Sequence, residues 1–151
     1  MSATTFGEQF MESGGAPVQY RGQEVHSLHR LPVQRRTVVP VRFVSAVPAT
    51  RQALRFTVEG GNLIVNGQAL SNVVLWSDTA PKSSSIEVVP SGAKCSVKVW
   101  NAWEDDAGVM QAWIGNGGMV LQQIPGGVRL RCSDGVGAPD FSDLVAELLL
   151  G

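Results

Sequence analysis

Short runs in which every second residue is apolar recur along this chain, and they constrain its fold more than any other feature. Leu54, Phe56 and Val58 alternate with polar residues, which places their side chains on one face of a pleated strand. Between two such runs, Asn66-Gly67 is typical of a two-residue hairpin turn, because both central positions need positive φ. We therefore expect a chain built mainly of antiparallel strands.

The alternating runs continue far into the second half of the chain. Later ones cover residues 94–100, 109–114, 119–124 and 128–132, and turns containing many of the 17 glycines and 8 prolines separate them. About eight or nine strands at this spacing are typical of a sandwich or barrel. We expect an antiparallel β-sandwich, jelly-roll-like or C2-like, over residues 37–151. Its register turns Cys95 and Cys132 toward the core as free thiols.

The first 36 residues are expected to form an N-terminal arm or small subdomain. Thr5 and Glu8 have the spacing of a capping box and Gly14-Gly15 supplies a stop, which predicts a short helix over residues 4–13. Two short runs on either side of Arg21-Gly22 predict a hairpin. A helix of this length is stable only when it docks on another part of the protein.

Charge is distributed unevenly along the chain, although the net charge is only -1. Residues 1–55 carry seven arginines against three glutamates, a balance of +4, whereas residues 101–151 carry two arginines against seven acids, a balance of -5. Such polarity either serves head-to-tail association or reflects two solvated faces. The basic half lacks interleaved aromatic residues, so nucleic-acid binding is not expected.

Nothing in the sequence predicts secretion or membrane insertion. No cationic and apolar leader opens the chain, and no apolar run approaches the roughly 20 residues that span a bilayer. Two cysteines are too few to staple a small secreted scaffold. We expect synthesis in a reducing cytoplasm.

Three of the four tryptophans lie close together in the sequence. Trp100 and Trp103 precede an acidic run, and Trp113 precedes a glycine-rich turn that contains Asn116. A hairpin would bring these residues into one neighbourhood. Two interpretations stay open: an exposed cluster that stacks on sugar rings or anchors a protein interface, and a second layer of core.

The last segment is compatible with two secondary structures. Phe141, Leu144, Val145 and Leu148 have helical spacing, whereas a strand would have to be buried on both faces. The segment from Ser133 to Val145, which includes Asp-Phe-Ser-Asp-Leu-Val, resembles the closing motif of calcium-associated bacterial β-sandwich modules. That resemblance favours a strand.

The same resemblance implies a cofactor, which is calcium. Asp134, Asp140 and Asp143 would be its ligands, because a glycine-bent loop can gather the six to eight oxygens that calcium prefers. Ser142 stands where the family has an amide or an acid, and Ala138-Pro139 stands where another acid is common. The alternative is that Asp134 serves a turn, while Asp140 and Asp143 cap a helix or tie the loop.

The N-terminus carries a second resemblance. A short helix bearing Phe6 and Phe10, followed by Pro17-Val18-Gln19-Tyr20-Arg21-Gly22, resembles the opening of head-to-tail joining proteins of tailed bacteriophages. It implies that the arm contacts a neighbouring subunit. The candidate interface residues are Phe6, Phe10, Tyr20, Arg21, Arg35 and Arg36.

These observations lead to one functional hypothesis and two alternatives. We expect a non-enzymatic structural or assembly protein, a virion component if the bacteriophage resemblance holds, which associates with copies of itself or with neighbouring structural proteins. The first alternative is a calcium-dependent module that binds carbohydrate or protein through its tryptophans. The second is a hydrolase using Asp105 or Asp106, although no known catalytic motif is present.

Overall fold

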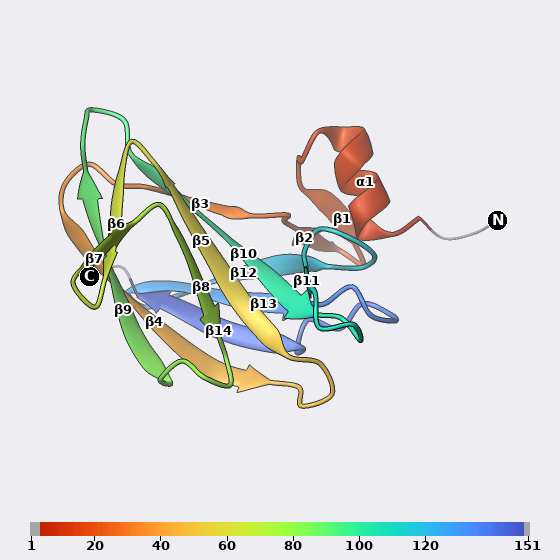
Figure 1. Cartoon of the computed structure of the whole chain (residues 1–151). Helices are drawn as coiled ribbons and strands as arrows, with labels where there is room; N and C mark the ends of the chain where they lie inside the picture. Colours follow the sequence, from red (N-terminus) through yellow and green to blue (C-terminus); the bar gives the residue numbers. More distant parts are fainter. Residues whose placement is uncertain (1–3, 150–151) are drawn as a thin grey trace.

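Fourteen strands and one helix form within residues 4–149, the part of the chain that the computed structural model describes. They make an antiparallel β-sandwich with a short N-terminal helix, as predicted (Figure 1). One sheet has the order β12 (Gly118–Ile124), β13 (Gly127–Ser133), β14 (Leu144–Leu149), β4 (Thr37–Ala46), β9 (Ser83–Pro90), β6 (Gly61–Val65) and β7 (Gln68–Leu70). The other has the order β11 (Met110–Gln111), β10 (Ser96–Glu104), β5 (Gln52–Glu59) and β8 (Asn72–Trp76), with β3 (His29–Pro32) paired to β10.

The predicted alternation produces the core between the two sheets. Leu54 and Phe56 of the five-stranded sheet face Val41 and Leu130 of the seven-stranded sheet in one buried cluster. Cys132 belongs to the same cluster and, like Cys95, is a buried free thiol, as predicted. Burial of this apolar surface is the main stabilising contribution to such a sandwich.

One long bent hairpin passes from one sheet to the other. Residues 52–65 form β5 and β6, which meet at Gly60, and β7 and β8 pair back along them. Gly60 has φ of 74°, and a Cβ there would lie 1.9 Å from the carbonyl oxygen of Lys94, so only glycine fits this corner. The turn at the hairpin tip is Asn66-Gly67, with φ of 51° and 79°, as predicted.

The C-terminal segment is a strand, and this confirms the choice of strand over helix. β14 lies between β13 and β4, which pair with both of its edges. Leu144 and Leu148 point into the core. On the other face, Glu147 is only 1% exposed because Arg42 and Arg129 lie over its carboxylate and donate hydrogen bonds to it.

The N-terminal arm is less separate than the predicted boundary at residue 36 implies. The predicted helix and hairpin form as α1 (Phe6–Ser13), capped by Thr5, and as β1 (Val18–Tyr20) with β2 (Gln23–Val25). However, β3 is part of the five-stranded sheet, and Leu31 and Val33 lie in the main core. Burial therefore assigns residues 29–33 to the sandwich. No helix among the described residues is long and apolar enough to cross a bilayer.

One predicted strand is largely absent. Residues 109–114 were expected to be extended, but only Met110–Gln111 pairs, at the end of β10. The following residues turn away from the sheet because Trp113 adopts φ of 63°, which breaks the extended conformation.

Candidate functional site

Two of the three clustered tryptophans are buried, so the structure does not contain the exposed cluster of three that one interpretation required. Trp103 is 2% exposed and Trp100 is 6% exposed. The ring of Trp103 lies directly under two glycine turns: a Cβ at Gly117 would lie 2.5 Å from it, and one at Gly135 would lie 2.4 Å from it. The glycines of these turns are therefore required by the size of the indole.

Trp100 lies on the opposite face of β10, on the outside of the five-stranded sheet. Its neighbour is Trp113, whose ring centroid is 4.6 Å away at an interplanar angle of 32°. Trp113 is 43% exposed, and its Nε1–H donates a 2.8 Å hydrogen bond to the carbonyl oxygen of Ser27. The Nε1 atom of Trp100 is buried and has no hydrogen-bond partner in the described part of the chain.

Trp113 has an unusual backbone conformation for its residue type. The other two non-glycine residues with positive φ among residues 4–149, Arg21 and Asn66, lie in hairpin turns, where this conformation is common. A bulky aromatic residue there is a genuine outlier, and such strain persists only where surrounding contacts enforce it. The stack on Trp100 and the bond to Ser27 are those contacts, and together they fix the position of the Trp113 side chain.

Arginine side chains cover the two other indole rings on the outer face of this sheet. The guanidinium of Arg51 lies 4.1 Å from the ring centroid of Trp76, and that of Arg55 lies 5.3 Å from the centroid of Trp100. Both distances are within the range of cation–π attraction. The tryptophan faces are thus already occupied by groups of the same chain.

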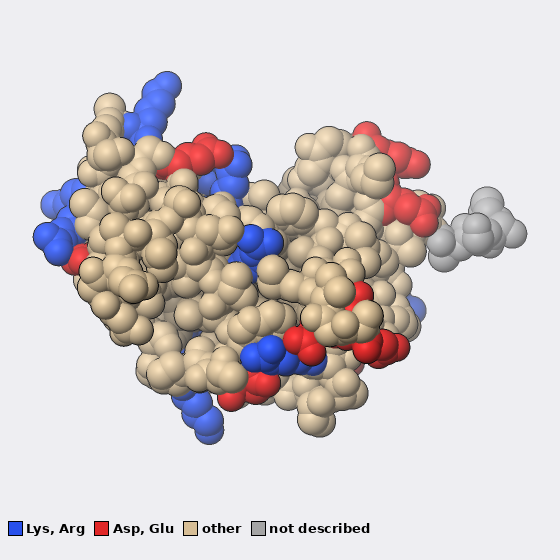
Figure 2. Space-filling view, in the orientation of Figure 1, with Lys and Arg blue, Asp and Glu red and all other residues tan. Residues whose placement is uncertain are grey.

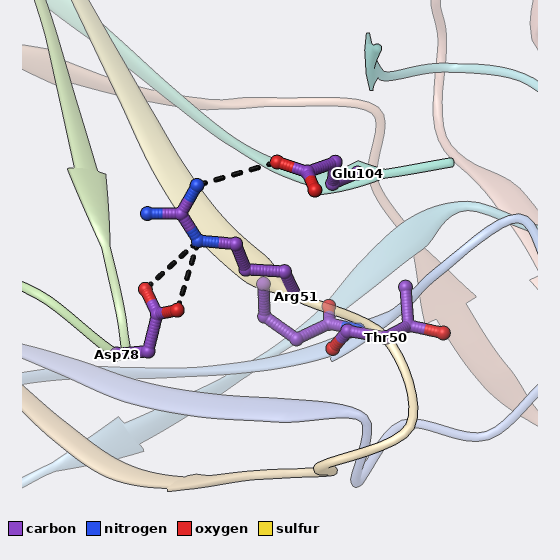
Figure 3. A network of polar contacts seen from close by, with 5 residues as sticks. Thr50, Arg51, Asp78 and Glu104 are labelled. Atoms are coloured by element: carbon purple, nitrogen blue, oxygen red, sulfur yellow. Dashed lines mark hydrogen bonds and ion pairs between the residues drawn. The ribbon is translucent and has the colours of Figure 1, made fainter. Parts of the chain in front are cut away.

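Arg51 is itself held between two acidic side chains. Its Nε bonds Asp78 at 2.9 and 3.0 Å, and its Nη1 bonds Glu104 at 3.2 Å (Figure 3). These hydrogen bonds raise the pKa of the guanidinium above its ordinary value, with Asp78 as the main cause. Arg51 immediately precedes β5 and Arg55 lies within it, so the alternation of an extended chain places both on one face; this spacing is the signal that could have located the surface. Sequence reasoning had assigned no role to Trp76 or to either arginine.

The loops at one end of the sandwich expose a set of apolar side chains. Trp113, Ile114 and Val136 are 43%, 51% and 59% exposed, and we call them the end patch. The two loops that carry them touch: a Cβ at Gly115 would lie 2.5 Å from the carbonyl oxygen of Gly135.

The end patch is supported by fixed contacts. The backbone N–H of Gly7, in α1, donates to the carbonyl oxygen of Gly115 at 2.9 Å, and Asn116 Nδ2 donates to the carbonyl oxygen of Gly137 at the same distance. Asn116, predicted to belong to a binding surface, thus links the two loops. The bond from Gly7 holds α1 against the loop that carries Trp113 and Ile114.

The three predicted calcium ligands lie in one loop, where each is engaged by neighbouring groups. Asp134 accepts bonds from Gln52 Nε2 and the Val136 N–H, and Asp140 accepts from the N–H and hydroxyl of Ser142. Asp143 accepts a 3.0 Å bond from the N–H of Asp134.

Electrostatics differ between two of these carboxylates. The bonds from Ser142 hold the pKa of Asp140 below its ordinary value. Burial, together with the charges of Asp134 and Asp140, raises the pKa of Asp143 to about 6. Within the described part of the chain, no three histidine, cysteine, aspartate or glutamate side chains are grouped as a metal site. Calcium binding stays a prediction.

Most of the predicted interface residues of the arm are used inside the chain. Phe6 and Phe10 are 2% and 5% exposed and form a second small core with Val18 and Val25. Their burial against the chain's own hairpin explains how so short a helix is stabilised. They cannot reach a neighbouring subunit while this core is intact.

The remaining arm residues lie nearer the surface. Tyr20 packs edge-on against Phe6 and lies under the guanidinium of Arg21. Tyr20 and Arg21 share a hollow of about 310 Å³ with Asp140, so the structure brings together residues predicted for two different sites. Arg36 is paired with Glu87 at 2.6 Å, whereas Arg35 is exposed.

Comparison with known proteins gives no further guidance. No protein-family model matches the chain, and no curated protein or solved structure matches it significantly. A functional proposal therefore depends on the surface of this chain alone.

Proposed function

We propose that this protein is a non-enzymatic assembly protein that joins further copies of itself or neighbouring structural proteins, with the end patch as a contact. The observation that carries the proposal is the exposure of Trp113, Ile114 and Val136 on two loops with well-determined contacts. Exposed apolar side chains that are gathered together mark protein interaction sites more often than isolated ones do. Aromatic residues such as Trp113 are also enriched among the residues that dominate binding energy.

The charge distribution supports head-to-tail contacts. In Figure 2 the acidic side chains gather at the end that carries α1, whereas most of the lysines and arginines lie toward the opposite end. The charges are therefore uneven in space as well, although the two ends do not correspond to the two parts of the sequence, because α1 with Glu8 and Glu12 belongs to the part with the balance of +4. Opposite ends of two copies attract each other, and such an electrostatic contribution favours association and orients it.

The association that we propose differs in its residues from the arm-mediated contact predicted from sequence. Phe6 and Phe10 are buried in the arm's own core, so they supply support for the end patch rather than contact with a neighbour. Arg35 is exposed and can add a basic contact at a neighbouring acidic end. A tailed-bacteriophage virion is the setting that the N-terminal resemblance suggests for such a subunit.

Carbohydrate binding by the tryptophans has less support. Sugar rings stack on free indole faces, but Arg51 and Arg55 already lie over Trp76 and Trp100. Only the outer part of Trp113 is free among these rings. Enzymatic activity has no support from the groove between β8 and β9, where Glu87 is the one titratable lining residue and is paired with Arg36.

The mass of the full chain in solution tests the proposal. We expect light scattering after size exclusion to show a defined oligomer, which dissociates when Ile114→Asp places a charge in the end patch. Val44→Asp is the matched control, because Val44 is equally exposed at 51% but lies on β4, outside the patch. High salt should also weaken the oligomer, since it screens the opposite charges.

Two results would contradict the proposal. A wild-type chain that stays monomeric at high concentration would contradict the self-association that we propose. An oligomer that responds equally to Ile114→Asp and Val44→Asp would place the contact elsewhere. Deleting residues 1–36 is not a suitable test, because Leu31 and Val33 belong to the main core.

A further inference from the structure

Among the strands of residues 4–149, β8 is a free edge of the five-stranded sheet. It pairs with β5 on one side and ends the strand order on the other. The bonds from the Ser77 N–H to Gln52 and from the Val58 N–H to Ser71 fix the register of this pair. Because peptide groups alternate in direction along an antiparallel strand, those of Val74 and Trp76 point away from β5.

Strand β9 has a second free edge close by. β6 pairs with only its C-terminal half, from Glu87 to Pro90, whereas β4 pairs with it from Ser83 to Val88. The bond from the Phe43 N–H to the Lys82 carbonyl sets the alternation on the β4 side. The peptide groups of Ser83 and Ser85 therefore point toward the side that β6 leaves open.

A groove of about 730 Å³ lies between these two edges, which bound its two long sides. Its apolar lining includes Ile64, Val65, Leu75 and Ile86, and its hydroxyl groups come from Thr79 and the three serines of residues 83–85. The one titratable lining residue, Glu87, is paired with Arg36. The groove thus offers apolar contacts and backbone hydrogen bonds without a free charge.

The sequence of β8 lacks the protection that free edges usually have. Natural edge strands carry charged side chains, prolines or bulges that block pairing with another chain. β8 reads Asn-Val-Val-Leu-Trp and contains none of these. An edge of this kind, beside an open groove, is suited to being covered.

We propose that the groove accepts an extended segment of a neighbouring polypeptide, which adds to β8 as an antiparallel strand. Main-chain bonds to Val74 and Trp76 would supply affinity, and every second side chain of the segment would enter the groove. The lining determines the chemistry of the segment: apolar residues alternate with small uncharged ones over about five residues, or about 17 Å. The groove is lined by β8 and β9, which lie away from α1 (Figure 1), and it shares no lining residue with the end patch, so this site is distinct from the contact proposed above.

A displayed library of random peptides about ten residues long tests this proposal. Wild-type protein is used for selection, and Ser84→Phe, which fills the groove, is used for counter-selection. The selected peptides should show apolar residues at alternate positions and no charge between them. Val74→Pro should weaken their binding at least about tenfold, because proline removes one outward N–H that β5 does not use.

Two controls separate edge pairing from general effects. Val44→Lys changes an exposed strand residue outside the groove and should leave peptide affinity unchanged. Methylation of alternate backbone nitrogens in the selected peptide removes its N–H donors without any change in the protein, and it should abolish binding. This test therefore remains valid even if circular dichroism shows that Val74→Pro is poorly folded. The proposal is overturned if no peptide is enriched over the Ser84→Phe variant, or if enriched peptides tolerate backbone methylation. Either result is independent of the oligomer measurement with Ile114→Asp.

Discussion

Replacing Asp143 by asparagine is expected to stabilise the folded protein at neutral pH and to have little effect in acid. Burial and two neighbouring carboxylates raise the pKa of Asp143 from 3.8 to about 6. An acid with a higher pKa in the folded than in the unfolded state binds its proton more tightly when folded. Its contribution to stability is therefore complete below pH 3.8 and is lost as pH rises through about 6.

The size of this effect follows from the two pKa values. The difference between 3.8 and about 6, at about 1.4 kcal/mol for each pH unit, corresponds to about 3 kcal/mol at neutral pH. The bond from the Asp134 N–H lowers the pKa of Asp143 and is already included in the value of about 6, and the neutral amide oxygen of Asn can still accept it. We expect the free energy of unfolding of Asp143→Asn to exceed that of the wild type by up to about 3 kcal/mol at neutral pH.

Urea denaturation of both proteins at about pH 7.5 and about pH 3.5 measures this difference. A variant that is less stable than the wild type at the higher pH would refute the reasoning, because it would mean that the charged carboxylate stabilises the loop. The same samples test the calcium prediction. If this loop binds calcium, added calcium should raise the melting temperature of the wild type more than that of the variant. A wild-type melting temperature that calcium does not change would contradict calcium binding by this loop.

Three further predictions concern stability and reactivity. Glu147→Gln should lower the free energy of unfolding by about 1 to 3 kcal/mol, because two arginines lose their charged partner. Since those arginines hold the pKa of Glu147 below 4.5, the loss should be present above that pH and vanish in urea titrations at lower pH; a loss independent of pH would contradict this cause. Burial raises the pKa of the Cys132 thiol, so a thiol reagent should modify it only after unfolding, and rapid labelling of the native protein would show that the core opens. Gly60→Ala should lower the free energy of unfolding by about 3 kcal/mol or more. Gly92→Ala is the control and should be nearly neutral, because its added Cβ meets nothing within 4 Å. Equal melting temperatures of the two variants would contradict the requirement for glycine at position 60.

Much of the strand arrangement was predictable from sequence because local patterns determine it. Alternation assigned Leu54 and Phe56 to one face, and the positive φ values at Asn66-Gly67 are those of the two-residue type I′ turn that this pair favours. The prediction failed at residues 109–114, where a largely apolar run is present but the chain turns. There the long-range stack of Trp113 on Trp100 overrides the local preference.

The candidate site was only partly predictable for the same reason. Sequence alone brought Trp100, Trp103 and Trp113 into one region, but it could not show that two of them are covered. Coverage depends on groups far away in the chain: Gly135 lies over Trp103, and Arg55 lies over Trp100. Such contacts leave no periodic pattern in the sequence.

The amino-acid sequence by itself determined the alternation of inward and outward side chains, the main turns and the mainly antiparallel class of the fold, since each of these depends on neighbouring residues. Only the tertiary structure decided which outward side chains are covered, where the acidic and basic side chains gather in space and which strands remain free edges. β8 illustrates the division. Its residues predict a strand, but whether its outer peptide groups are paired depends on the order of strands in the sheet, and that order is set by the packing of the whole chain.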